Sequence, residues 1–177
     1  MRELTSEMQD LDIKWENKLR PHTFEQFPGQ NDVKEKIKVF VQGAISPAFI
    51  GESIAKHSSK LGIGAHSIFL GQVRNDVIED KTITAIDYSV YEEMAQEKMY
   101  AIREETFSKY LLSCMHIYHS IGKVAVGEIS LFVFTSSKHR KDAMDACTYL
   151  VDRIKVDVPI WGKEIFSDES FQWKTNG

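Results

Sequence analysis

Two short groups of residues carry side chains suited to binding an anion. Arg74 follows Gly71 in the run GQVR. A glycine permits close backbone approach there, and an arginine can bind a phosphate or carboxylate through two hydrogen bonds. His139 and Arg140 form the second group, in which a histidine can exchange protons near neutral pH and an arginine stays charged. Both groups also fit an ordinary surface turn.

Lys155 is a candidate for proton transfer, because it ends an amphipathic segment that is helical in its spacing. A lysine held among apolar groups loses stabilisation of its charge and can then exchange a proton. The alternative is a lysine that stabilises the C-terminus of a helix dipole. Residues 161–164, with the sequence WGKE, follow it, and their tryptophan can either pack in a core or form a wall beside a planar ring.

Strands and helices alternate in the segments that must position these residues. A helix is expected to begin at Pro47 with Ser46 as its cap, and Pro159 must end the helix that carries Lys155. The other expected elements are strands at 39–41, 66–70, 83–91, 115–119, 124–135 and from 160, with a long helix over 92–112. Long helices between hairpin-like strand pairs predict an α+β fold with a mixed or antiparallel sheet.

Several breaks between these elements are also expected. Gly122 should turn the chain between two strands, and residues 76–81 should form a polar loop. Ser136 or Ser137 should cap the helix that carries Lys155. The segment 167–177 reads as a mostly polar tail.

Composition excludes several function classes. The chain has 177 residues, of which 42% are hydrophobic and 27% charged, with a net charge of -4. This suits one globular domain with a short appendage and gives no bulk affinity for nucleic acid. No apolar run is long enough to span a membrane and the start has no secretory pattern, so a cytoplasmic protein is expected. Cys114 and Cys147 lie in apolar segments without metal-ligand spacing, and His116 and His119 fall on opposite faces of a strand, so no metal site is expected.

An N-terminal extension over residues 1–38 is expected before a main domain at 39–177. Residues 19–41 weakly resemble the entry segment of the ATPase motor in bacterial Holliday-junction branch-migration helicases. No GxxxxGK[ST] phosphate loop follows, so ATPase activity is not expected. A chance match within a disordered arm is the alternative.

Seven spaced runs in the segment 39–173 resemble one family, the large catalytic subunits of molybdopterin synthases. They are residues 64–75, 91–95, 119–122, 126–128, 136–140, 152–155 and 159–164. The resemblance implies an α/β-hammerhead type fold and a homodimer. It also implies sulfur transfer to cyclic pyranopterin monophosphate from a small ubiquitin-like carrier with a C-terminal Gly-Gly thiocarboxylate. Two carriers bound to one dimer make a heterotetramer. The product of the reaction is molybdopterin, which bears a dithiolene. No cofactor or metal is implied.

The resemblance also implies which residues form the site. Lys155 falls on the key catalytic lysine of the family. Substrate-binding positions fall on Gln72, Val73, Arg74, His139, Arg140, Lys155, Gly162, Lys163 and Glu164. Many relatives carry a lysine where Gly162 stands, so Lys163 is expected to act as the second catalytic lysine. Many also carry His-Arg where His119 and Ser120 stand.

A non-catalytic module that binds a phosphate or a nucleotide is the alternative function. It predicts no carrier partner and no effect of replacing Lys155 with alanine.

Overall fold

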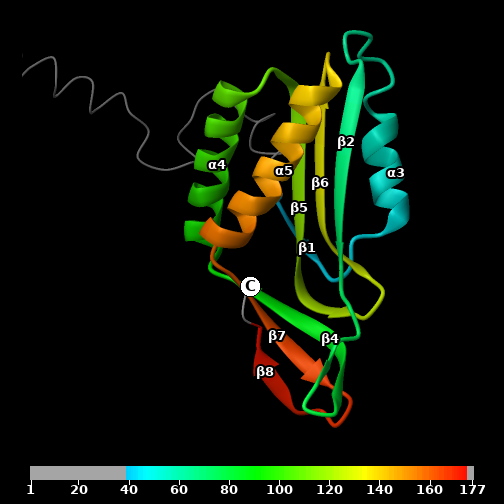
Figure 1. The fold of residues 1–177 in the computed structure, drawn as a ribbon, viewed down its shortest axis with the longest axis vertical. Coiled ribbons are helices and arrows are strands. Elements are labelled where there is room, and N and C mark those ends of the chain that lie inside the picture. Colours follow the sequence, from blue (N-terminus) through cyan, green and yellow to red (C-terminus); the bar gives the residue numbers. More distant parts are fainter. Residues whose placement is uncertain (1–38, 175–177) are drawn as a thin grey trace, which may run out of the picture. The chain divides into compact units, whose positions relative to one another are not determined.

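The computed structural model describes residues 39–174, whose helices and strands are labelled in Figure 1. Three helices and eight strands lie within these residues. In chain order they are β1 (Phe40–Gln42), α3 (Pro47–Ala55), β2 (Ala65–Gln72), β3 (Val77–Ile78), β4 (Lys81–Val90), α4 (Glu92–Lys109), β5 (Leu112–Ala125), β6 (Ile129–Ser137), α5 (Arg140–Asp157), β7 (Ile160–Phe166) and β8 (Phe171–Trp173). The proposed extension at 1–38 lies outside the described residues.

Six strands follow one another across the sheet in the order β2-β6-β5-β4-β7-β8, while β1 pairs with β5 and β3 with β4. The β1–β5 pair is parallel, and the other strand pairs among the described residues are antiparallel. The sheet is therefore mixed, which confirms the α+β class expected from the sequence. No helix within residues 39–174 is long and apolar enough to cross a membrane.

Strand β5 joins two halves of this sheet. Its first part, from Leu112 to His119, pairs with β6, and its last part, from Gly122 to Ala125, pairs with β4. Figure 1 shows α4 and α5 beside the first half, with β4, β7 and β8 extending beyond the helices. Because α5 ends at Asp157 and leads through Pro159 into β7, its C-terminal end lies where the two halves meet.

The helices cover both faces of the first half. Leu131 and Val133 of β6 pack with α5 residues such as Leu150 and belong to one buried cluster. Phe132 and Phe134 belong to a second cluster with residues of α3. Since successive strand residues point to opposite faces, α3 and the α4–α5 pair lie on opposite sides of the sheet. This explains why β6 is buried from Ser130 to Ser137 without alternation.

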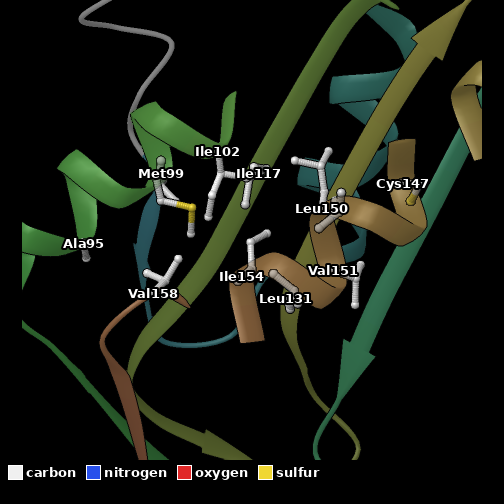
Figure 2. Packing of buried hydrophobic residues seen from close by; sticks show 12 residues of the cluster. Ala95, Met99, Ile102, Ile117, Leu131, Cys147, Leu150, Val151, Ile154 and Val158 are labelled. Carbon is white, nitrogen blue, oxygen red and sulfur yellow. The ribbon is translucent and has the colours of Figure 1, made fainter. Parts of the chain in front are cut away.

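The predicted apolar face of α5 forms the centre of the first cluster. Figure 2 shows Leu150 and Ile154 of α5, with Met99 and Ile102 of α4, around Ile117 and Leu131 of the sheet. A buried side chain of this size contributes about 1.5–3 kcal/mol relative to leaving it in water. This packing fixes the axis of α5 and therefore the position of its last turn.

One predicted helix cap is confirmed and one is wrong. Ser46 caps α3, since its Oγ accepts a hydrogen bond from the N–H of Phe49 at 3.2 Å. In contrast, Ser136 and Ser137 are the last residues of β6, and His139 is the N-cap of α5 without a side-chain capping bond. Ser137 instead donates its hydroxyl to the carbonyl of Leu111 at 2.6 Å, which secures the strand end.

The prediction that Gly122 turns the chain is also wrong. Strand β5 runs through Gly122, although its φ is +77°, and the turn to β6 lies at Gly127 with φ +86°. A side chain at Gly122 would come within 2.5 Å of the Gln42 side chain. Both glycines therefore adopt a positive φ, which other residues rarely do, but only Gly127 lies in the turn between two strands.

Two segments expected to be irregular contain strands. Residues 76–81 include β3, which pairs with β4 through a tight hairpin whose Glu79 and Asp80 have positive φ values. The polar tail includes β8, which pairs with β7. Both strands are only two or three residues long, too short for a periodic pattern.

Candidate active site

A cavity of about 550 Å³ lies where the ends of β2 and α5 meet strands β4, β6 and β7. Four of the residues predicted for the site line it, namely Gln72, Arg74, Lys155 and Gly162. They come from three elements that are far apart in the sequence. The junction between the two halves of the sheet therefore brings together four of the nine predicted site residues, including Lys155.

The end of β2 supplies Gln72 and Arg74. A shift in register between Gly71 and Gln72 interrupts the pairing with β6 at this point. Beyond it, Val73 is buried with Ile86 and Val124 and anchors the strand end.

The Arg74 side chain is 75% exposed and forms an ion pair with Asp76 at 2.8 Å. An arginine that remains so exposed loses little hydration in pairing, so an anionic ligand can replace this carboxylate as its partner.

Lys155 lies in the last turn of α5 between two buried residues, Ile154 and Val158. Its own side chain is exposed and its Nζ lies 5.8 Å from the centre of the Phe69 ring. The lysine is therefore positioned beside the apolar surface rather than buried in it. The packed helix fixes its backbone, while its ammonium group can reach into the cavity.

Tyr88 and His119 form an inner wall that the sequence patterns did not single out as functional. Their rings meet edge to face with centres 5.0 Å apart. The Tyr88 hydroxyl donates to Ser130 Oγ at 3.3 Å, and Ser130 donates to the carbonyl of Gly71 at 3.3 Å. Tyr88 is also paired across the sheet with Gly122 on one side and Gly162 on the other. Its ring thus stands between two positions without side chains.

Burial sets the protonation of both rings. It raises the pKa of Tyr88 above its usual value, although the hydrogen bond with Ser130 opposes this, so the phenol stays protonated. Burial lowers the pKa of His119 below its usual value, with a smaller opposing effect from its bond to the carbonyl of Ser120. That carbonyl lies 2.8 Å from His119 Nδ1, so Nδ1 carries the proton and Nε2 is an acceptor. The inner wall is therefore neutral and can still donate and accept hydrogen bonds.

Lys174 is a cation of the site that no sequence pattern indicated. Its N–H donates to the carbonyl of Gly162 at 2.8 Å, and its side chain passes over that glycine. A Cβ at position 162 would lie 3.5 Å from both Cβ and Cδ of Lys174 and 3.0 Å from Ile86. The stem of Lys174 therefore lies in van der Waals reach of position 162 where its side chain approaches the cavity.

Glu164 is the acidic partner of Lys174. The residue is 6% exposed and accepts a hydrogen bond from Gln172 Nε2 at 2.8 Å, while Lys174 Nζ lies 3.8 Å from its other oxygen. Glu164 does not line the cavity itself. Its carboxylate instead positions the lysine that does.

Lys163 lies on the other face of β7, because neighbouring strand residues point to opposite sides. Its Nζ is 3.7 Å from the centre of the Phe171 ring on β8, and Lys163 does not line the cavity. The two residues from the start of α5, His139 and Arg140, also lie away from it. Arg140 is 15 residues from Lys155 on the same helix, a separation of about 22 Å. One chain therefore does not bring these three residues to the cavity.

The cavity combines positive charge with neutral hydrogen-bonding groups. Arg74, Lys155 and Lys174 approach it from separate elements, and Tyr88 and His119 close its inner side. Such an arrangement can neutralise a phosphate and hold a planar polar ring. A lysine among these groups can also transfer a proton to a leaving atom.

Comparisons with known proteins agree with this fold. The sequence model of a family described as "MoaE protein" matches residues 44–157. The chain is 38% identical over 120 residues to the molybdopterin synthase catalytic subunit of Oryza sativa subsp. indica, covering 68% of this chain and 61% of the rice protein. It is 34% identical over 156 residues to the molybdopterin synthase catalytic subunit of Bos taurus, covering 87% of this chain and 81% of the bovine protein. The match thus spans less than two thirds of the rice relative.

A solved structure of molybdopterin synthase from Staphylococcus aureus superimposes with a TM-score of 0.68 at 31% identity, over 77% of this chain and 96% of that chain. This likeness confirms the expected fold. The helicase resemblance of residues 19–41 is not borne out by these comparisons, and most of that segment lies outside the described residues.

Proposed function

The chain belongs to the MoaE protein family, and on that premise we propose that it is the catalytic subunit of a molybdopterin synthase. It transfers sulfur from a small ubiquitin-like carrier, whose C-terminal Gly-Gly ends in a thiocarboxylate, to cyclic pyranopterin monophosphate in the cytoplasm. The observation that carries the proposal is the cavity in which Arg74, Lys155 and Lys174 converge beside the neutral wall of Tyr88 and His119.

Each group of the cavity has a role in this reaction. Arg74 and Lys174 hold the phosphate of the substrate, and the rings of Tyr88 and His119 bind the pterin. The thiocarboxylate sulfur forms a bond to a side-chain carbon of the substrate while the carbon–oxygen bond at that carbon breaks, and the departing oxygen takes up a proton. Water then cleaves the bond between the carrier acyl carbon and sulfur, which leaves a carboxylate on the carrier and sulfur on the pterin. Lys155 supplies and accepts the protons that these steps require.

The site is completed by a second chain. His139 and Arg140 lie outside the cavity of their own chain but fall on substrate-binding positions of the family. A two-fold homodimer places the start of α5 from one protomer against the cavity of the other. One carrier on each protomer then gives a heterotetramer.

Mixing the protein with a thiocarboxylated carrier and the cyclic pterin tests the proposed function. Dithiolene must form only when all three components are present, and thiocarboxylate must be consumed in step with it. Binding of the pterin without product, whatever carrier is supplied, would instead support a non-catalytic phosphate-binding module.

Lys174→Ala should reduce kcat/KM by at least about tenfold, because it removes a cation from the lining of the proposed substrate cavity. Lys163→Ala is the matched control on the same strand pair, and it tests the second catalytic lysine expected from the sequence. We expect the smaller loss at Lys163, since its ammonium group lies over Phe171. A larger loss for Lys163→Ala would instead support Lys163 as the second catalytic lysine.

We further propose that residues 39–177 form the catalytic domain and that residues 1–38 are an extension that catalysis does not need. The family match begins at residue 44, and strand β1 begins at Phe40. Deleting residues 1–35 should therefore change kcat/KM by less than about threefold. Steady-state kinetics measures the activity of the truncated chain, and the yield of folded protein measures its stability. A large fall in kcat/KM or in that yield would show that the extension is part of the catalytic domain.

A further inference from the structure

Two histidines and a cysteine meet on the face of the sheet that α3 covers. His57 follows the C-terminal end of α3, while Cys114 and His116 lie on β5. One possible ligand atom from each residue lies within 4.8 Å of the other two. His57 and His116 are 59 residues apart, so no sequence spacing could indicate this cluster.

Local structure brings the three side chains together. Cys114 and His116 are two residues apart on one strand and therefore point to the same face. The ring of Phe134 packs beside both histidines, with centres 4.9 Å from His57 and 5.8 Å from His116. His57 is 6% exposed, so its donor atoms lie in a mostly dry environment.

A backbone carbonyl fixes the tautomer of His57. Its Nδ1 lies 2.8 Å from the carbonyl oxygen of Ser53, and a carbonyl can only accept, so Nδ1 carries the proton. The lone pair of Nε2 therefore faces His116 Nε2, at 3.1 Å. A histidine that binds a metal through one ring nitrogen typically donates the other N–H to a carbonyl or carboxylate in this way.

The spacing of the donor atoms suits a tetrahedral ion. With Zn–N bonds of about 2.0–2.1 Å, two nitrogens separated by 3.1 Å subtend an angle of roughly 100° at the metal. A thiolate at about 2.3 Å from the ion would lie about 3.6 Å from each nitrogen. The Cys114 sulfur lies within 4.8 Å of one ring nitrogen of each histidine, so metal binding requires it to move closer by about 1 Å.

We propose that His57, Cys114 and His116 form a Zn²⁺ site that fastens the end of α3 to β5. Two imidazoles and one thiolate suit a borderline-soft ion of this kind, and three protein ligands leave one position for water or a small ligand. Binding requires the Cys114 thiol to lose its proton and His116 to carry its proton on Nδ1. The site lies apart from the cavity that holds Lys155, so its test is independent of the proposed activity.

The test uses the full chain after removal of metal with a chelator. Titration with Co²⁺ as a spectroscopic probe should show one equivalent bound, with a thiolate-to-cobalt charge-transfer band and the visible absorption of a tetrahedral ion. Cys114→Ser should lose the charge-transfer band, while Cys147→Ser should keep it. Cys147 is a matched control because it is the other cysteine of the chain and is buried in a different cluster.

Stability gives a second measurement. Zn²⁺ at about 100 times its Kd should raise the melting temperature of the wild-type protein by at least about 4 °C. The same addition should release about one thiol proton. Both effects should be lost in His57→Gln, whose metal-free fold is checked by circular dichroism.

The proposal is overturned if Co²⁺ gives no charge-transfer band with the wild-type chain, or if Cys114→Ser binds it equally well. In that case His57 and His116 only form a hydrogen bond with each other, in which His116 Nε2–H donates to His57 Nε2. If His57→Gln does not fold, comparison of the two cysteine variants still decides between these outcomes.

Discussion

Replacing Lys155 with alanine should lower kcat for sulfur transfer by about 10²- to 10⁴-fold, the range for loss of a group that transfers protons. The fold should be unaffected, because Lys155 is exposed whereas its neighbours Ile154 and Val158 hold α5 to the core. Single-turnover formation of product from thiocarboxylated carrier measures the chemical step, and a thermal melt measures the fold.

Lys109→Ala is the matched control for this experiment. Lys109 is the basic residue in the last turn of α4, as Lys155 is in the last turn of α5. Each substitution removes one cation from the negative end of a helix dipole, so each should cost a similar fraction of stability. Only Lys155→Ala should remove activity. Near-normal turnover of that variant would show that Lys155 stabilises the C-terminal end of α5 and takes no part in the reaction.

The second large effect concerns Arg140. Arg140→Ala and Lys155→Ala should each inactivate the enzyme alone, yet an equal mixture of the two chains should recover about a quarter of wild-type activity. Random exchange makes half of the dimers mixed, and each mixed dimer holds one intact pocket of two. The physical reason is the separation of about 22 Å along one helix, which a single small pterin cannot bridge.

A mixture of Arg74→Ala and Lys155→Ala chains is the control for this complementation. Both residues line the cavity of the same chain, so no mixed dimer contains an intact pocket and no activity should return. Subunit exchange is verified by native mass spectrometry of differently tagged chains. Failure of the first mixture to recover activity, with exchange demonstrated, would refute a site shared between protomers.

Local signals in the sequence predicted the parts of the fold that depend on neighbouring residues. Ser46 and Pro47 placed the start of α3, since a cap and a fixed φ act within one turn. The apolar spacing of α5 identified both its buried face and the helix end that carries Lys155. Arg74 was found because a glycine precedes it at a strand end.

The remaining features depend on register and on contacts between distant segments. Lys174 reaches the cavity because β8 pairs with β7, and that three-residue strand has no pattern of its own. Tyr88 stands between Gly122 and Gly162 only through the register of three strands. His57 meets β5 through the packing of α3. None of these relations is visible in local spacing, because each is set by tertiary structure.

The relation between Gly162 and Lys174 makes the two positions interdependent. A Cβ at 162 would already lie in van der Waals contact with the stem of Lys174, at 3.5 Å, so the effect of a longer side chain there depends on which residue stands at 174. Gly162→Lys should therefore be tolerated better in a Lys174→Ala background than alone. If relatives carry a lysine in this column, an alignment would score the chain as lacking a charge there, although Lys174 brings an ammonium group to the same cavity from the segment after β8. At position 162, the absence of a lysine is therefore no evidence that the cavity lacks a cation.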